Sequence, residues 1–589
     1  MTTTKQYDYM RVCLKNGRRP AAALLPVRFV GPLLTARCGD ARNGPPRAQP
    51  KSLAADHFRF FRQTLNRLTQ ISSAPSASYT LPLTFNYNYN PANQRTKDTL
   101  ADGSYWVYGY DSLGQVTNAC KFFSDGTPVA GQLFDYTFDT IGNRTQTLAG
   151  GDATGGGLRL ANYSANNLNQ ITSRDVIGRV DILGASILTN VVTVNGQTAY
   201  RKQEYYRQQL AVNNSAGALW TNIIISGGQN VTGSVYVAQE PESFKYDADG
   251  NLTNDGRWAY TWDGENRLVA MTTNNLVGPP YHLTFSYDFQ GRRIQKTAMT
   301  NGVTIASYNF LYDGWNLVAE LNQSDLLARS YVWGTDLSGT SQGASGVGGL
   351  LEVTYHGSSV TNCFLAFDGN GNVAALINAA DGTVAANYEY AAFGEPIRIT
   401  GAMAKNNPFR FSTKYDDDES DLLYYGYRYY KPSTGTWPNR DPLNESGFRL
   451  ISNSPRKPLH WNEGQSLYCF LANQTISSTD FLGLRGCNAV NDANCRAKGG
   501  TCVHIISIWI PFTGVDLEIS YCKMPCSKPE VCPNTGYIDQ PPVGDPFNGL
   551  GDGFFLPAMR ICLYSCPTHG ATRMYYPEGT KCPSTFTYP

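Results

Sequence analysis

Short segments that alternate apolar and polar residues recur along most of the chain. In residues 283–287 (LTFSY) and 260–262 (YTW), aromatic or branched side chains occupy every second position. Alternation with a period of two is typical of a strand with one buried and one solvated face. Gly, Asn and Asp, which favour tight turns, separate these segments. The pattern predicts an all-β fold built from hairpins.

The turns share one motif, in which an aromatic residue precedes Asp, two variable residues and Gly. Asp can accept backbone N–H groups of the turn, and Gly adopts a left-handed backbone conformation without a steric penalty. One copy alone would be an ordinary surface turn, so the repetition carries the interpretation. Four copies place the two residues at Asp111 and Gly114, Asp139 and Gly142, Asp247 and Gly250, and Asp288 and Gly291.

The composition agrees with stacked hairpins. Aromatic residues make up 12% of the 589 residues, charged residues only 16%, and there are 57 Gly. This composition excludes a disordered or coiled-coil chain. Because one hairpin cannot bury its aromatic face alone, the units are expected to stack into a long sheet.

These repeats resemble the RHS and YD-repeat proteins over residues 80–484. The resemblance is most specific in residues 385–445, where 426–432 (GYRYYKP) and 435–442 (GTWPNRDP) are similar to the RHS-associated core. In that family the repeats wind as a spiral β-sheet into a cocoon. The core plugs one end, and a variable C-terminal domain, often a toxin, is cut free and held inside. The resemblance implies a YD-repeat spiral shell here, and because family shells are longer, a partial cocoon or a fragment of one.

This reading divides the chain into four parts. It gives a basic leader that lacks the repeat and packs into no domain, a YD-repeat shell, an RHS-associated core with a self-cleavage site, and a small Cys-rich C-terminal domain as candidate cargo. Their ranges are 1–75, 80–384, 385–484 and 485–589.

The resemblance also implies catalytic residues. Asp418 and Asp441 match the positions of the two catalytic aspartates, and Arg428 matches a motif arginine. Two carboxylates that share a proton can hydrolyse a peptide bond, because one activates water while the other protonates the carbonyl. Without the family resemblance, Asp418 would be interpreted as part of a solvated turn, because it lies in the acidic run 416–419.

The family cuts after the Leu of an Asp-Pro-x-Gly-Leu motif, which residues 480–484 (DFLGL) resemble. The predicted cut therefore lies between Leu484 and Arg485. Phe481 replaces the motif proline, and Asp421 stands where the family usually has Gly.

Nine of the 14 cysteines fall in residues 485–589. This density favours a disulfide framework that forms in an oxidising compartment. Zinc is the competing interpretation, since Cys522 and Cys526, like Cys562 and Cys566, are spaced as metal ligands can be. Disulfides are preferred, and no metal site and no cofactor is predicted. No motif names the activity of this part.

The leader holds thirteen Lys or Arg against three acids, whereas the whole chain has a net charge of +1. Such a segment can be an arm that binds nucleic acid or a membrane, or simply a poorly ordered one. No apolar run is long enough for a transmembrane helix, and no signal peptide is convincing. The protein is expected to be secreted or to lie at the cell surface.

Two functions stay open. The first is a shell that encloses a C-terminal effector and frees it by a single self-cleavage, without a diffusible substrate. The alternative is a cell-surface adhesion or carbohydrate-binding module that is not cleaved. The expected partners are the enclosed C-terminal domain and, as further candidates, secretion machinery, an immunity protein or cell-surface glycans. No nucleic acid is predicted to bind the shell.

Overall fold

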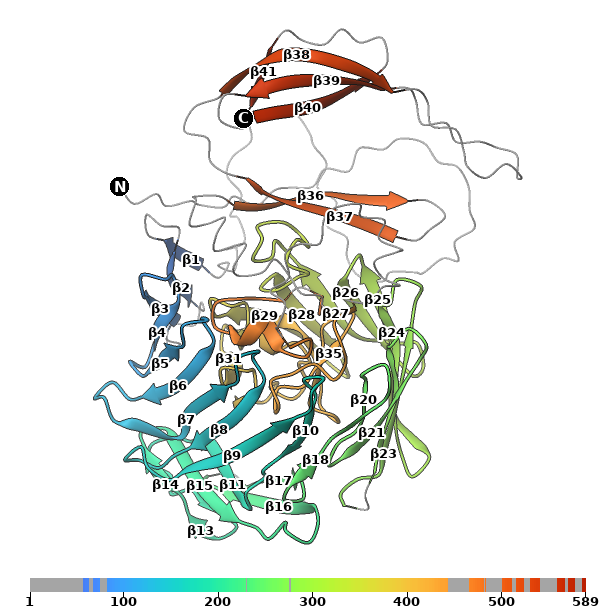
Figure 1. The fold of residues 1–589 in the computed structure, drawn as a ribbon. Coiled ribbons are helices and arrows are strands. Elements are labelled where there is room, and N and C mark those ends of the chain that lie inside the picture. The colour runs from blue at the N-terminus through green and yellow to red at the C-terminus, as the bar shows by residue number, and fades with distance from the viewer. Residues whose placement is uncertain are drawn as a thin grey trace, which may run out of the picture. The chain divides into compact units, whose positions relative to one another are not determined.

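A computed structural model of the chain is shown in Figure 1. It describes residues 57–62, 67–74, 82–228, 230–274, 277–442, 466–480 and 482–483, and strands between 501 and 588. The chain divides into two compact units, residues 1–484 and 485–589, called here the first and second units.

Two long antiparallel sheets form most of the first unit, and sequence neighbours pair in each of them. The 11-stranded sheet contains β1 His57–Arg62, β2 Leu68–Ala74, β3 Leu83–Tyr89, β4 Arg95–Leu100, β5 Tyr105–Tyr110, β6 Val116–Phe122, β7 Pro128–Phe138, β8 Arg144–Gly150, β9 Leu158–Ala165, β10 Ile171–Arg174 and β18 Glu242–Ser243. The 14-stranded sheet contains β19 Lys245–Tyr246, β20 Leu252–Asn254, β21 Trp258–Trp262, β22 Leu268–Thr273, β23 Tyr281–Tyr287, β24 Arg293–Thr300, β25 Val303–Asp313, β26 Asn316–Asn322, β27 Leu327–Trp333, β28 Leu350–His356, β29 Val360–Phe367, β30 Val373–Asn378, β31 Val384–Tyr390 and β32 Pro396–Thr400.

Between β10 and β18 the chain leaves the repeat and forms two small sheets. Their strands are β11 Arg179–Ala185, β14 Tyr200–Lys202 and β15 Tyr205–Ala211 in one sheet, and β12 Thr193–Val194, β13 Gln197–Thr198, β16 Leu219–Ser226 and β17 Asn230–Val237 in the other. Because β10 pairs directly with β18, the long ladder continues past this insertion.

The repeat turns have the geometry that their residues favour. Asp139 Oδ1 accepts the backbone N–H groups of Ile141 at 3.0 Å and Asn143 at 2.8 Å. Gly142 has a φ of +89°, in the left-handed region. The same arrangement holds at Asp111 and Asp288. The side chain of Asp thus satisfies the turn, which explains why Asp and Gly recur together.

In several units a tyrosine at the motif aromatic position links the unit to the one before it. The hydroxyl donates to a backbone carbonyl just after the preceding turn, as Tyr110 does to Arg95, Tyr287 to Leu268 and Tyr312 to Arg293, and as Tyr390 does to Val373 at the corresponding position of a turn without the Asp. A register shift also falls at the motif aromatic in many hairpins, including at Tyr110, Phe138 and Tyr287. Since such bulges increase local twist, the repeat itself bends the sheets.

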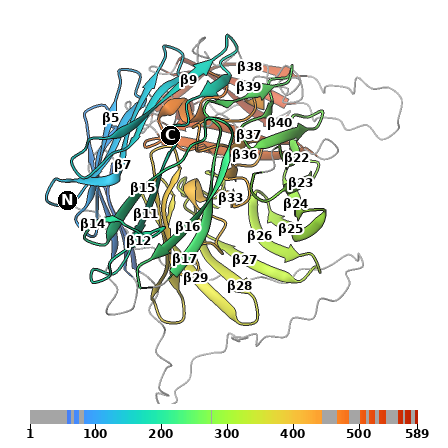
Figure 2. The ribbon, with the colours of Figure 1, turned by 90° about the horizontal axis from the view of Figure 1, so that it is seen from below.

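The segment that follows the last repeat packs against the inner faces of both sheets, and it is called here the core segment (residues 404–442 and 466–483). It contains the 3-10 helices η1 Phe411–Thr413 and η3 Phe470–Asn473 and the strands β33 Tyr415–Asp417, β34 Leu422–Tyr424 and β35 Tyr429–Tyr430. Figures 1 and 2 show it between the long sheets. Asn473 donates to the Gly142 carbonyl at 2.9 Å and Tyr468 to the Gly250 carbonyl at 2.8 Å, so the core segment contacts repeat turns directly.

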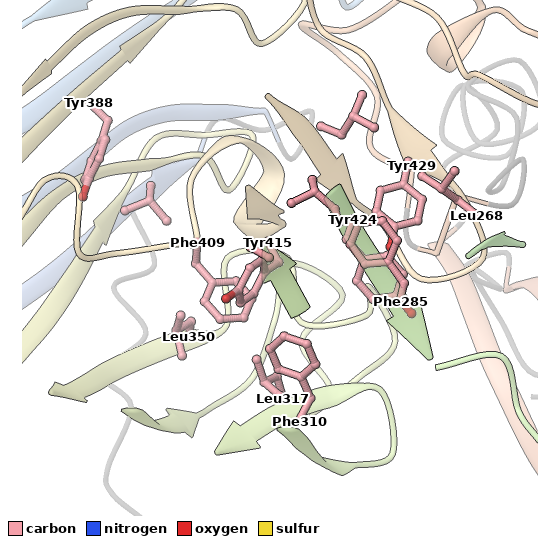
Figure 3. Close-up of a cluster of buried hydrophobic side chains, with 14 of the residues drawn as sticks. Leu268, Phe285, Phe310, Leu317, Leu350, Tyr388, Phe409, Tyr415, Tyr424 and Tyr429 are labelled. Atoms are coloured by element: carbon pink, nitrogen blue, oxygen red, sulfur yellow. The ribbon is translucent and has the colours of Figure 1, made fainter. Parts of the chain in front are cut away.

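The largest hydrophobic cluster joins the 14-stranded sheet to the core segment (Figure 3). Phe285 and Phe310 of the sheet meet Tyr429 and Tyr415 at ring-centroid distances of 5.5 Å. A second cluster lies within the core segment, where Tyr430 stacks on Phe470 at 3.9 Å. The core segment therefore contributes side chains to the same hydrophobic cluster as the 14-stranded sheet.

The second unit contains a two-stranded sheet, β36 Thr501–Ile510 and β37 Val515–Lys523. A four-stranded sheet follows with β38 Glu530–Gln540, β39 Met559–Cys566, β40 Gly570–Pro577 and β41 Thr585–Tyr588 in the order β40-β39-β38-β41. The cysteine side chains of this unit, and the disulfides and zinc ligands considered for them, lie outside the residues whose side chains are described.

The predicted all-β fold is confirmed. One boundary needs correction, because the leader was expected to pack into no domain up to residue 75, whereas β1 and β2 belong to the long sheet and Ile71 is buried. Residues 1–56 lie outside the described part. Among the described residues, no helix combines the length and apolar character needed to cross a membrane.

Candidate functional site

Arg428 is the centre of a buried ionic cluster in the core segment. Its side chain is only 2% exposed and its guanidinium lies over the Trp437 ring at 3.9 Å. Arg428 Nη2 is 3.0 Å from Asp441 Oδ2 and 3.7 Å from Asp480 Oδ2. Two carboxylates, both nearly excluded from solvent, therefore flank a single cation.

Asp480 belongs to the predicted recognition motif, and the motif folds back on this cluster. Asp480 Oδ1 accepts the backbone N–H of Gly483 at 2.9 Å, and Arg428 Nε donates to the Gly483 carbonyl. One residue earlier, the Leu482 carbonyl accepts the Tyr427 backbone N–H at 2.9 Å. Asp480, Leu482 and Gly483 are thus held beside the cluster by hydrogen bonds.

Gly483 is required by this close approach. Its φ is +70°, and a Cβ there would lie 3.1 Å from the backbone nitrogen of Arg428 and 3.2 Å from Cβ of Tyr425. A side chain would be strained in the backbone and would push against Arg428. The glycine therefore lets the chain pass directly beside the cluster.

The electrostatics favour a proton on Asp480. Burial and the negative charge of Asp441 together raise the pKa of Asp480 to about 7, against the opposing charges of Arg428 and Lys414. Burial likewise lowers the pKa of Lys414 to about 8. Near neutral pH the Asp480 carboxyl can therefore carry a proton while Arg428 pairs with Asp441, which suits acid–base chemistry.

The structure brings together two of the three residues assigned from the sequence, Arg428 and Asp441. Asp418 lies in a different ion pair, where it shares Arg410 with Asp416 at 2.7 and 2.8 Å, and its side chain is 56% exposed. The acid beside Asp441 is Asp480, which the sequence analysis used only as part of the recognition motif. The sequence feature that could have identified Asp480 is its position four residues before the predicted cut. Leu484 and Arg485 themselves lie outside the described residues.

No group of three or more His, Cys, Asp or Glu side chains suited to a metal ion is found in the described part of the chain.

Comparison with curated proteins finds bacterial toxins. The tRNA3(Ser)-specific nuclease WapA of Bacillus spizizenii is 32% identical over 225 residues, which cover 36% of this chain and 9% of that protein. The double-stranded DNA deaminase toxin A of Burkholderia cenocepacia is 29% identical, with 37% and 16% covered. The probable deoxyribonuclease RhsA of Dickeya dadantii is 24% identical over 429 residues, with 67% and 24% covered. These relatives support the assignment of the chain to the RHS-repeat proteins.

This RHS-repeat protein spans between 9% and 24% of the length of these three relatives. No family model matches it. Among solved structures it is similar to the TcdB2-TccC3-Cdc42 crystal structure, at 14% identity and a TM-score of 0.35, with 74% of this chain and 21% of that chain covered. The Photorhabdus luminescens Tc holotoxin pore gives 14% identity and a TM-score of 0.34, with 73% and 20% covered.

Proposed function

We propose that this RHS-repeat protein is a shell that encloses a C-terminal effector, residues 485–589, and frees it by hydrolysing the bond between Leu484 and Arg485. The observation that carries the proposal is the binding of residues 480–483 beside a buried pair of acids that share Arg428. The predicted bond begins one residue after Gly483, and this closeness in sequence supports cleavage at the cluster.

The proposed roles follow from the charges. Ionised Asp441 takes a proton from a water whose oxygen bonds to the Leu484 carbonyl carbon, while protonated Asp480 donates to the carbonyl oxygen. The C–N bond then breaks as Asp441 passes its proton to the Arg485 nitrogen, and a hydroxyl of the tetrahedral intermediate returns a proton to Asp480. The products are a C-terminal carboxylate at Leu484 and a new amino terminus at Arg485, after a single turnover.

The surroundings of the repeat aromatics favour enclosure over the adhesion alternative. A surface that binds glycans by stacking needs aromatic rings exposed to solvent. Four large aromatic residues of the strands are at most 5% exposed: Tyr87, Tyr136, Trp258 and Tyr260.

The effector would act after export. The nuclease and deaminase activities in the names of the relatives support a toxic cargo, and such a cargo would call for an immunity protein in the producing cell. Up to eight of the nine cysteines of residues 485–589 would then be oxidised to disulfides within the fragment at the destination. Thiol counting on the released fragment tests this last step, and a stable fragment with nine free thiols and no metal would contradict it.

The decisive experiment is intact-mass analysis of the expressed chain and of three Asp→Asn variants. The wild type is expected as two fragments that meet at Leu484 and Arg485. Asp441→Asn and Asp480→Asn should each give one uncut chain, whereas Asp418→Asn, the matched control, should be cut. An uncut wild type would refute self-cleavage. Cleavage in Asp480→Asn with none in Asp418→Asn would refute the proposed pair.

A further inference from the structure

A second site of interest lies in the first unit, away from the residues assigned to cleavage. It is a cavity of about 270 Å³ lined by β3, β4 and β5 on one side and by β31 on the other. Neither Arg428, Asp441 nor Asp480 lines it. Ala101 and Asp102, which do line it, are exposed, so the cavity reaches the surface. An apolar cavity of 150 Å³ already holds benzene, so a small organic molecule fits this one.

The walls combine aromatic rings with an excess of acid. Trp106 and Tyr108 are among the aromatic residues that line the cavity. The lining also contains five carboxylates and only two guanidinium groups: Asp98, Asp102, Glu204, Asp368 and Glu389, with Arg95 and Arg398. Such a surface repels anions and attracts a cation.

Most of these charged groups have partners within the protein. Glu389 pairs with the buried Lys121 and lies 3.3 Å from Arg398. Asp368 Oδ2 accepts the side-chain amide of Asn372 at 2.8 Å. Arg95 donates to Asn370 at 2.9 Å. These contacts fix the positions of charged side chains in the wall of the cavity.

Asp98 is 7% exposed, and its buried Oδ1 has no hydrogen-bond partner. Glu389 Oε2 also lacks a hydrogen-bond partner, but Glu389 lies in two ion pairs, whereas no ion pair of Asp98 is found among the described residues. Leaving a buried carboxylate oxygen without a donor is costly. Burial raises the pKa of Asp98 to about 8, although Arg95 opposes the shift. A donor that arrives with a ligand would remove this penalty.

We propose that the cavity binds a small organic cation, whose primary amine or guanidinium pairs with Asp98 and whose apolar or aromatic body packs against Trp106 and Tyr108. A charged N–H donor forms a strong hydrogen bond with a carboxylate. The rings add cation–π attraction and apolar contact. A neutral sugar offers no charged donor to Asp98, so the unpartnered carboxyl oxygen favours the cation. This inference does not depend on self-cleavage.

Calorimetric titration of the full chain tests the proposal with tyramine and agmatine as probes. At least one probe should bind saturably at one site. For tyramine, the neutral isostere 4-propylphenol should bind at least tenfold more weakly, a comparison that requires no variant. Asp98→Asn should weaken binding at least tenfold, and Trp106→Phe should weaken it to a smaller degree. Asp313→Asn, at an exposed acid outside the cavity, should bind as the wild type does.

Thermal unfolding of Asp98→Asn serves as the check on folding, and its midpoint should not fall, because the change removes a buried unpaired acid. The proposal is overturned if neither probe binds saturably, if 4-propylphenol binds as tightly as tyramine, or if Asp98→Asn binds as the wild type does. Saturable binding of a neutral sugar such as glucose in place of both cations would also overturn it.

Discussion

Two buried ionic clusters in the core segment use the same residue types with opposite stoichiometry. At Asp417, one fully buried carboxylate is held by two cations, with Arg293 Nη1 at 2.6 Å and Lys296 Nζ at 2.8 Å. At Arg428, one cation is shared by two carboxylates, Asp441 and Asp480. The first cluster joins the core segment to β24, and the second lies beside the predicted cut.

The difference appears in the proton affinity of the acids. Burial alone would raise the pKa of Asp417, but Arg293 and Lys296 hold it below its ordinary value. Burial raises the pKa of Asp480 to about 7 and Arg428 does not reverse the shift. An acid with two cations stays ionised and structural, whereas an acid that competes for one cation is ready to exchange a proton. Counting cations per buried acid thus separates a structural cluster from a candidate catalytic one.

The largest expected effect is at the structural cluster. Arg293→Met leaves Asp417 buried with one cation fewer and should lower the free energy of unfolding by about 3–5 kcal/mol. Denaturant unfolding measures the change. Arg267→Met, which breaks the more exposed pair with Asp263, is the control and should cost less than about 1 kcal/mol. Equal losses in both variants would contradict the structural role of the Asp417 cluster.

At the candidate catalytic cluster, removing one charged side chain should not lower the free energy of unfolding. Asp480→Asn removes an acid that is costly to ionise when buried. A carboxyl whose folded pKa is raised contributes stability below its unfolded pKa, and this contribution is lost as pH rises from about 4 through about 7. The variant should therefore be at least as stable as uncut Asp441→Asn at pH 8, and it should stay uncut. A large loss of stability at pH 8 would place Asp480 with the structural acids.

A variant that cleaves itself slowly allows the pH dependence of the cleavage rate to be measured. Gly483→Ala adds a Cβ beside Arg428 at a positive φ. A strain of about 1–2 kcal/mol should slow cleavage roughly tenfold or more, so that uncut chain can be purified and followed by gel. Its rate should fall as pH rises above about 7, because Asp480 then loses the proton it donates.

Lys414→Met sharpens the same test. Lys414 lowers the pKa of Asp480, so its removal should shift the fall in rate to higher pH in the Gly483→Ala background. A merely structural role of Lys414 would change the rate without moving the pH profile. Lys405→Met, at an exposed lysine of the core segment, is the matched control and should leave the profile in place.

The fold was accessible from the sequence because the repeat is local. Asp139 and Gly142 satisfy their own turn, so four adjacent residues carry the whole signal. The bond from each motif aromatic to the preceding unit was not predicted, since a Tyr in a strand pattern does not disclose what its hydroxyl meets. The start of the sheet was missed for a related reason, because β1 and β2 pair with the ladder without carrying the motif.

The candidate site was only partly accessible, because its residues are brought together by tertiary packing. Arg428 and Asp441 lie 13 residues apart and were found through the family motif. Asp480 lies further along the chain, and no periodicity or spacing indicates that it contacts the same guanidinium. Asp418 matches the family motif by its position in the sequence. In the structure, however, it forms an exposed ion pair with Arg410, outside this cluster. The proposal prefers Asp480 to Asp418 because Asp480 is buried, and burial is a property of the fold.

The smallest expected effect concerns the bonds between repeat units, which neither cluster uses. Tyr312 donates to the Arg293 carbonyl at 2.9 Å, so Tyr312→Phe removes one hydrogen bond and keeps the ring. The free energy of unfolding should fall by about 1 kcal/mol, and cleavage should be complete as in the wild type. Denaturant unfolding measures the loss, with Tyr200→Phe at a hydroxyl-bearing ring that is 42% exposed as the control. No change in Tyr312→Phe would show that stacking of the units rests on the buried rings alone, and lost cleavage would show that the spacing of the units also sets the geometry at Arg428.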